Sequence, residues 1–155
     1  MTLLDNYEIL ASLDSSCISE RRQIENHNRK EYKKKVLPFI TPTVEFETQY
    51  KHNGIYRFNE LLDALKIDGE IMKEFEEIIN EKVSELKKYS SYVYIGKNDM
   101  RIISETNFVA GNLEEKTYLV TRDKNMIRFF EKAKDDTSKN LEVVGVKKFH
   151  HEINR

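Results

Sequence analysis

The sequence predicts an α/β fold: a short parallel central sheet of about four or five strands with helices on both faces. Two observations indicate this class. Short apolar runs alternate along the chain with longer helical patterns, as expected for parallel strands joined by helical crossovers. Only two Pro and five Gly interrupt the 155 residues, and we find neither a Ser/Gly-rich linker nor an internal repeat. Residues 1–155 are therefore expected to form a single domain.

Four apolar runs are predicted to be the strands, and two of them end in an aspartate. The first run stops abruptly at Asp14, and the third leads into Asp123. A run of apolar residues that ends at polar side chains is typical of a buried strand reaching the edge of its sheet. The four runs are residues 7–13, 36–40, 118–120 and 141–144. A short polar tail is expected after the last.

Six segments are predicted to be mainly helical. They are residues 19–35, 43–50, 58–65 and 69–89, a segment that Asp99 opens and Gly111-Asn112 closes, and 124–134. The longest, 69–89, keeps an apolar stripe at helical spacing, which indicates core packing or a dimer contact. The segment 43–50 also fits a period of two, but Thr41-Pro42 resembles an N-cap followed by proline at the first helical position, which favours a helix.

Composition and charge exclude several classes of protein. Lys and Arg total 26 against 27 Asp and Glu, so the net charge of -1 gives no global attraction to nucleic acid or to acidic membranes. Any polyanion must be bound by a local patch. The absence of a long apolar run and of a targeting segment predicts a cytoplasmic protein that neither crosses nor binds a membrane. Cys17 is the single cysteine, which excludes an intrachain disulfide, and no Cys/His cluster suggests zinc.

Carboxylates at predicted strand ends and helix starts indicate a metal site. Asp14 and Asp123 follow two strands, Glu47 lies just after the second strand, and Asp99 opens a helix. Taken singly, such acids most often cap helices or close turns. In parallel sheets, however, ligands bind beyond the carboxyl ends of the strands, and four carboxylates gathered there would repel one another. A hard cation such as Mg²⁺ or Mn²⁺ would relieve that repulsion.

Four short sequence blocks, in this order, resemble the PIN-domain family of metal-dependent nucleases. The blocks are ILASLDSS at residues 9–16, TPTVEFE at 41–47, NDMRIIS at 98–104 and YLVTRDKN at 118–125. The last block, a strand followed by Thr-x-Asp and a second polar residue, is the most specific. The resemblance covers most of the chain and implies a PIN-like three-layer fold with a helical insert around 58–90. That insert is longer than in the smallest toxins of the family.

The resemblance implies hydrolysis of RNA, less often DNA, by a metal-activated water. Asp14 and Asp99 would hold the principal Mg²⁺ or Mn²⁺, and Glu47 and Asp123 would complete this catalytic site; Glu45 is an alternative to Glu47. Residues that could orient the carboxylates or a bound water are Ser15, Ser16, Thr121 and Asn125, although Ser15 and Ser16 equally suit local turn hydrogen bonds. Because the family includes toxins of toxin–antitoxin pairs, an antitoxin protein and a homodimer are candidate partners.

Basic and aromatic residues around these blocks are candidate substrate contacts. Arg122 and Lys124 bracket Asp123, and Arg21 and Arg22 begin a basic run that could equally be a solvated face. Three further side chains, Tyr92, Tyr94 and Tyr118, could stack on bases but are expected to pack in the core. Cys17 is expected to be a buried small side chain. No specific role is expected for His150 and His151.

Three other classes of protein compete with a nuclease. A PIN-like nucleic-acid-binding or scaffold module without activity is disfavoured because all four acids are present. A receiver-like signalling domain would need paired acids at the end of the first strand, whereas Ser12 and Leu13 precede Asp14. A metal-free nucleic-acid-binding protein is disfavoured by the balanced charge.

Overall fold

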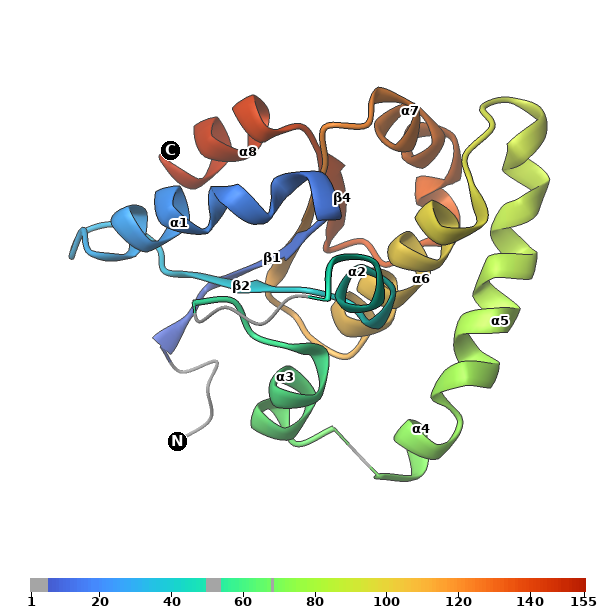
Figure 1. Ribbon diagram of the computed structural model, residues 1–155, viewed down its shortest axis with the longest axis horizontal. Helices are drawn as coiled ribbons and strands as arrows, with labels where there is room; N and C mark the ends of the chain where they lie inside the picture. Colours follow the sequence, from blue (N-terminus) through green and yellow to red (C-terminus); the bar gives the residue numbers. More distant parts are fainter. Residues whose placement is uncertain (1–5, 50–53, 68) are drawn as a thin grey trace.

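The computed structural model describes residues 6–49, 54–67 and 69–155, and it confirms the α/β class. A four-stranded, all-parallel sheet with the strand order β2-β1-β3-β4 forms its centre (Figure 1). The strands are β1 (Ile9–Leu13), β2 (Val36–Phe39), β3 (Lys116–Val120) and β4 (Leu141–Val144). Every residue of β1 is buried, as expected for a central strand with both faces covered.

The register between the two central strands determines what lies at the edge of the sheet. Leu13 of β1 pairs with Val120 of β3, so both strands end at the same level. The backbone N–H of Asp14 donates to the carbonyl of Val120 at 3.0 Å, which extends this pairing by one step. The residues that follow the two strands, Asp14 and Thr121, are therefore brought together at the carboxyl edge of the sheet.

Eight α-helices and three 3₁₀ helices are named within the described residues. The α-helices are α1 (Arg21–Asn28), α2 (Pro42–Thr48), α3 (Phe58–Leu65), α4 (Gly69–Lys73), α5 (Phe75–Leu86), α6 (Lys97–Gly111), α7 (Lys124–Ala133) and α8 (Val146–Ile153). The 3₁₀ helices are η2 (Ser15–Glu20), η3 (Lys87–Ser91) and η4 (Lys134–Asp136).

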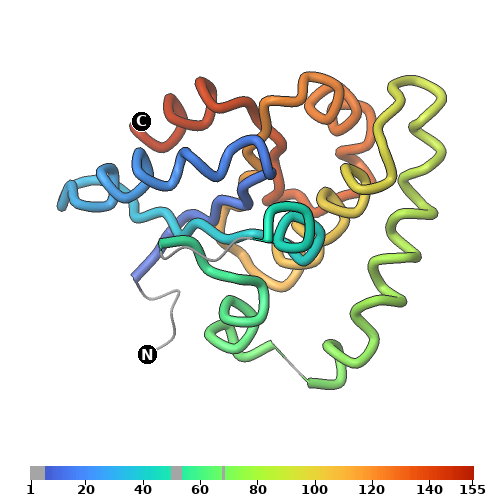
Figure 2. The backbone as a smooth tube through the Cα atoms, in the orientation of Figure 1, coloured from blue at the N-terminus to red at the C-terminus, as the bar shows by residue number. Residues whose placement is uncertain are grey.

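The helices form layers on the two faces of the sheet. From β1 the chain moves outward to β2, then crosses back over β1 to β3, and right-handed crossovers in opposite directions place their helices on opposite faces. Accordingly, α1 packs on β2 and α6 on β3 and β4, while α5 lies outside α6 (Figure 1). The last helix, α8, runs beside α1, as the tube in Figure 2 shows, and Lys33 Nζ donates to the Asn154 carbonyl there.

The predicted polar tail is wrong, because α8 follows β4. Phe149 and Ile153 of this helix are buried, and Phe149 packs edge-on against Tyr118 of β3 with ring centroids 5.6 Å apart. The apolar residues Val146, Phe149 and Ile153 recur at helical spacing between charged residues. This short stripe closes the α1 face of the sheet.

Two predicted helices are shorter than expected. The segment 69–89 is interrupted at Glu74, between α4 and α5, and continues as η3 after Leu86. The segment 19–35 is helical only as far as Asn28. The ambiguous segment after Thr41-Pro42 is the helix α2, which ends where Gln49 adopts a left-handed backbone with φ of 49°; Tyr50, the last residue of that prediction, lies outside the described residues.

No helix in the described part of the chain combines the length and the apolar character that crossing a bilayer requires.

Candidate active site

Asp14 occupies the centre of the carboxyl edge and is held by hydroxyl and amide donors. Its Oδ2 accepts from Thr121 Oγ1 at 2.7 Å, and its Oδ1 accepts from the backbone N–H of Ser15 at 2.9 Å. Ser16 Oγ adds a longer contact of 3.4 Å to Oδ2. Asp14 is only 6% exposed, so the carboxylate is both desolvated and fixed in orientation.

Thr121 connects Asp14 with Asp123. The fully buried hydroxyl donates to Asp14 and accepts from the backbone N–H of Asp123 at 3.0 Å. Asp123 in turn is the N-cap of α7, where its Oδ1 accepts from the backbone N–H of Asn125 at 2.8 Å and of Met126 at 3.4 Å. The predicted cap role of Asp123 is therefore confirmed, and its Oδ2 accepts no hydrogen bond from the residues that the structure describes. Asn125 contributes through its backbone to this cap.

Glu47 reaches the same edge from α2. Its Oε1 accepts from Ser15 Oγ at 3.2 Å, and its Oε2 contacts Asn98 Nδ2 of α6 at 3.5 Å. Glu45, the alternative, lies in the first turn of the same helix and pairs with Arg57 at 3.9 Å. Of the two glutamates, Glu47 is the one whose contacts link it to the surroundings of Asp14.

A fully buried carboxylate anchors α2 in this position. Glu105 of α6 accepts from the backbone N–H of Thr43 at 3.2 Å and from its hydroxyl at 2.9 Å, at the N-terminal turn of α2. Arg101, one turn earlier on α6, lies 3.6 Å from Oε2 of this glutamate, the oxygen that also accepts from the Thr43 hydroxyl, and it pairs with Glu76 of α5 as well. Burial raises the pKa of Glu105, while the Thr43 contacts and the Arg101 charge oppose this rise. No local sequence pattern indicates this anchor, because Thr43 and Glu105 are 62 positions apart.

Asp99 lies in the first turn of α6 and is the acid most affected by the others. Gly96, rather than Asp99, is the N-cap of the helix, and a backbone contact with Gly96 acts to lower the pKa of Asp99, against the larger effects that raise it. Burial, together with the charges of Asp14, Asp123 and Glu47, raises the pKa of Asp99 from 3.8 to about 6. The contacts of Ser15 with Asp14 and Glu47, of Thr121 with Asp14 and Asp123, and of Asn98, the neighbour of Asp99, with Glu47 place the four acids around a common region, in keeping with their effect on the pKa of Asp99.

Within residues 6–49, 54–67 and 69–155, no ion pair joins any of the four carboxylates to a Lys, Arg or His side chain. Over the same residues, no three acidic, His or Cys side chains come close enough to hold a metal ion as they stand. The donor chemistry of the edge, all carboxylate and hydroxyl oxygen, suits a hard cation.

The predicted substrate contacts have different surroundings. Arg122 bends away from Asp123: its guanidinium donates to the Ser16 carbonyl and pairs with Glu20 at 2.8 Å. Glu20 is also in contact with His150, whose Nε2 lies 2.8 Å from the second carboxylate oxygen. His150 therefore has a structural contact, contrary to the prediction that it has no specific role. Lys124 is exposed beside Asp123.

Arg21 and Arg22 begin α1, on the face of the sheet opposite α6. Arg22 is exposed, and Arg21 lines a hollow of about 580 Å³ between α1 and the edge strand β2. None of the contacts described for the carboxylate edge involves either arginine. Arg122 and Lys124 are thus next to Asp123 in the sequence, but the Arg122 guanidinium is engaged by Ser16 and Glu20, and Arg21 and Arg22 lie on the other face of the sheet.

Of the predictions for the remaining side chains, those for Tyr118 and Cys17 are confirmed and those for Tyr92 and Tyr94 are wrong. Tyr118 is buried in the sheet as expected, and burial raises its pKa to about 12. Tyr92 and Tyr94 are wrongly predicted, because they are 69% and 77% exposed in the segment between η3 and α6. Cys17 is buried, and burial raises the pKa of its thiol, which confirms a small packed side chain rather than a reactive one.

No protein-family model, characterised protein or solved structure matches this chain.

Proposed function

We propose that the protein is a PIN-like, Mg²⁺- or Mn²⁺-dependent endoribonuclease that hydrolyses phosphodiester bonds at the carboxyl edge of its sheet. The observation that supports the proposal is the gathering of Asp14, Glu47, Asp99 and Asp123 around one region without a basic partner among the described residues. Repulsion between carboxylates destabilises a fold unless a group of opposite charge compensates it. Oxygen ligands of this kind favour a hard divalent cation.

When bound, the cation would supply charge neutralisation at the phosphate and a lowered pKa for the attacking water. The chain's own part is to hold the ligands. Thr121 and Ser15 fix the orientation of Asp14, and Ser15 links two of the acids, because its backbone N–H donates to Asp14 and its hydroxyl donates to Glu47. Asp99 and Asp123 each lie at the start of a helix, where a backbone contact limits the orientation of the carboxylate.

The raised pKa of Asp99 gives the site a further property. With a pKa of about 6, a fraction of this carboxyl holds a proton near neutrality when no cation is present. A cation would displace that proton, so binding becomes tighter as the pH rises through about 6. Such a coupling between protonation and cation binding is expected of carboxylates that bind a metal ion.

The test is cleavage of a pool of single-stranded RNA by the purified protein. We expect cleavage with Mg²⁺ or Mn²⁺, none with a chelator, and a loss of about 10²–10³-fold in Asp14→Asn. Far-ultraviolet circular dichroism must show that this variant is folded. RNA that is bound but never cut with either metal would overturn the nuclease in favour of an inactive binding module.

The control variant is Glu45→Gln. It removes a carboxylate from the same helix as Glu47, but one that pairs with Arg57. We expect its cleavage rate to equal that of the wild type. Equal losses in Asp14→Asn and Glu45→Gln would contradict a site built from the four acids.

A further inference from the structure

A groove of about 610 Å³ runs between the start of α7 and the start of α8, and its rim is basic. Ile127 and Val146 contribute apolar surface to it. Five basic side chains line it: Arg122, Lys124, Lys147, Lys148 and His151. No acidic side chain is among the residues that line it. The groove therefore has a mainly apolar floor and a basic rim, and the rim is a local excess of positive charge on a chain whose net charge is only -1.

Several of these basic groups are not neutralised by the protein itself. Arg122 pairs with Glu20 and Lys148 with Glu142 at 3.0 Å. Lys124, Lys147 and His151, by contrast, have no hydrogen-bond or ion-pair partner among the described residues. Two free ammonium groups on one groove complement an anion of repeating charge.

A second hollow provides a contrast. The hollow of about 580 Å³ between α1 and β2 is lined by Arg21, Arg29 and Arg57, but also by Glu25 and Glu60. Arg29 pairs with Glu25 at 3.3 Å, so part of the positive charge of that hollow is cancelled in place. The hollow between α1 and β2 thus carries charges of both signs, whereas the charged side chains of the groove between α7 and α8 are all basic.

The groove is continuous with the carboxylate edge. Thr121 lines it, and the hydroxyl of the same residue holds Asp14 Oδ2 at 2.7 Å. Asp123 lies in the sequence between two lining residues, Arg122 and Lys124. A chain of phosphates that leaves the carboxylates on the β4 side would enter the groove directly.

We propose that this groove binds the phosphate backbone of the RNA strand next to the bond that is cut, through Lys124 and Lys147. The inference rests on the proposed function for the identity of the strand, and on charge complementarity for the site. It replaces Arg21 and Arg22 as the predicted backbone contacts. Phosphate contacts of this kind position a strand without reading its sequence.

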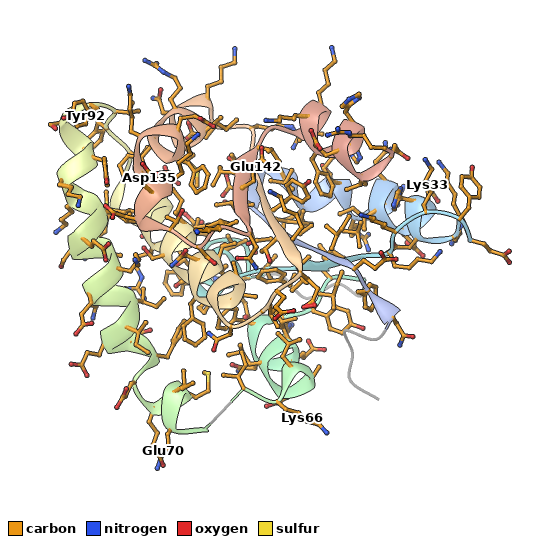
Figure 3. The ribbon with its side chains drawn as sticks, turned by 180° about the vertical axis from the view of Figure 1, so that it is seen from behind. Lys33, Lys66, Glu70, Tyr92, Asp135 and Glu142 are labelled. Carbon is orange, nitrogen blue, oxygen red and sulfur yellow. The ribbon has the colours of Figure 1, made fainter. Side chains whose placement is uncertain are left out.

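The test is binding of a fluorescein-labelled oligouridylate, measured by fluorescence anisotropy with a chelator present and over a series of salt concentrations. The double variant Lys124→Gln/Lys147→Gln is compared with Lys66→Gln/Lys73→Gln, which removes the same charge from the end of α3 and from α4. Lys66 lies at the opposite end of the molecule from α7 and α8 (Figure 3). We expect weaker binding in the first variant only. The slope of log affinity against log salt should fall in magnitude by about 1.4, because each lost phosphate contact on a single strand accounts for about 0.7.

The outcomes separate this inference from the proposed function. If RNA is cleaved with metal but both double variants bind it as the wild type does, the groove is wrong and the nuclease stands. If the lysine pair governs binding but no metal supports cleavage, the groove stands and the nuclease falls. Binding of poly-glutamate through the same two lysines, with no binding of the oligouridylate, would overturn the RNA assignment in favour of an acidic protein.

Discussion

Two acids on the same helix, Asp99 and Glu105, show how differently a carboxylate can be buried. Both have a raised pKa with burial as the largest cause. Glu105 is completely enclosed, yet it has two Thr43 donors and a nearby Arg101. Asp99 has one backbone donor and three other carboxylates. Burial alone therefore does not distinguish an anchor from a candidate ligand; the sign of the neighbouring charge does.

The first way to break this comparison is to remove each carboxylate. We expect Glu105→Ala to lower the free energy of unfolding by about 3 kcal/mol, because it leaves the Thr43 donors and Arg101 without their acceptor. Asp99→Asn is expected to leave stability unchanged or to raise it, since it relieves repulsion. Urea denaturation of both variants, with a chelator present, measures the difference. A large loss in Asp99→Asn and none in Glu105→Ala would invert the two roles.

The second way is to vary the pH. The folded-state pKa of Asp99 is about 6 and its ordinary value is 3.8. Because the folded state binds this proton more tightly than the unfolded state, the contribution of Asp99 to stability is fully present below pH 3.8. It is lost as the pH rises through about 6. The wild type should therefore lose about 1–2 kcal/mol relative to Asp99→Asn between pH 4 and pH 7, allowing for solvent screening of a partly exposed group. Metal-free thermal unfolding checks this; a constant difference across that range would rule out the repulsion.

The third and smallest effect sharpens the choice between neighbouring glutamates. Glu47→Gln is expected to slow RNA cleavage by about tenfold to a hundredfold, as for an outlying ligand, with little change in stability. Its counterpart, Glu45→Gln, breaks a surface ion pair with Arg57 and should change stability by less than about 1 kcal/mol without slowing cleavage. Initial rates at saturating Mn²⁺ distinguish them. Slower cleavage in Glu45→Gln alone would exchange the two assignments.

The strand ends were predictable, because an apolar run that stops at a carboxylate is a local signal. Asp14 and Asp123 follow β1 and β3 as expected, and α2 begins at Pro42 as the Thr41-Pro42 pair predicts. The choice between Glu45 and Glu47 was not predictable. It depends on Arg57, Ser15 and Asn98, which lie on other elements.

Contacts between distant segments account for the other misses. The pairing of Arg122 with Glu20 joins residues 102 positions apart, so no local pattern reveals that the arginine is already engaged. Glu105 has the same character, since its partner Thr43 is 62 positions away. The helix α8 was missed for a different reason. Its apolar stripe is short, and the charged residues between its members suggested a solvated tail.

The pairing of Leu13 with Val120 has a consequence for how the protein can fail. Side chains alternate along a strand, so a slip of β1 by one residue toward the interior would put Asp14 in the place of Leu13 and leave Ser15 where the Thr121 hydroxyl now meets an acid. Such a molecule would bury the Asp14 carboxylate inside the sheet and would at the same time remove it from the carboxyl edge. A molecule with this register should therefore be unstable and should lack the proposed activity. We expect no stably folded population with partial activity.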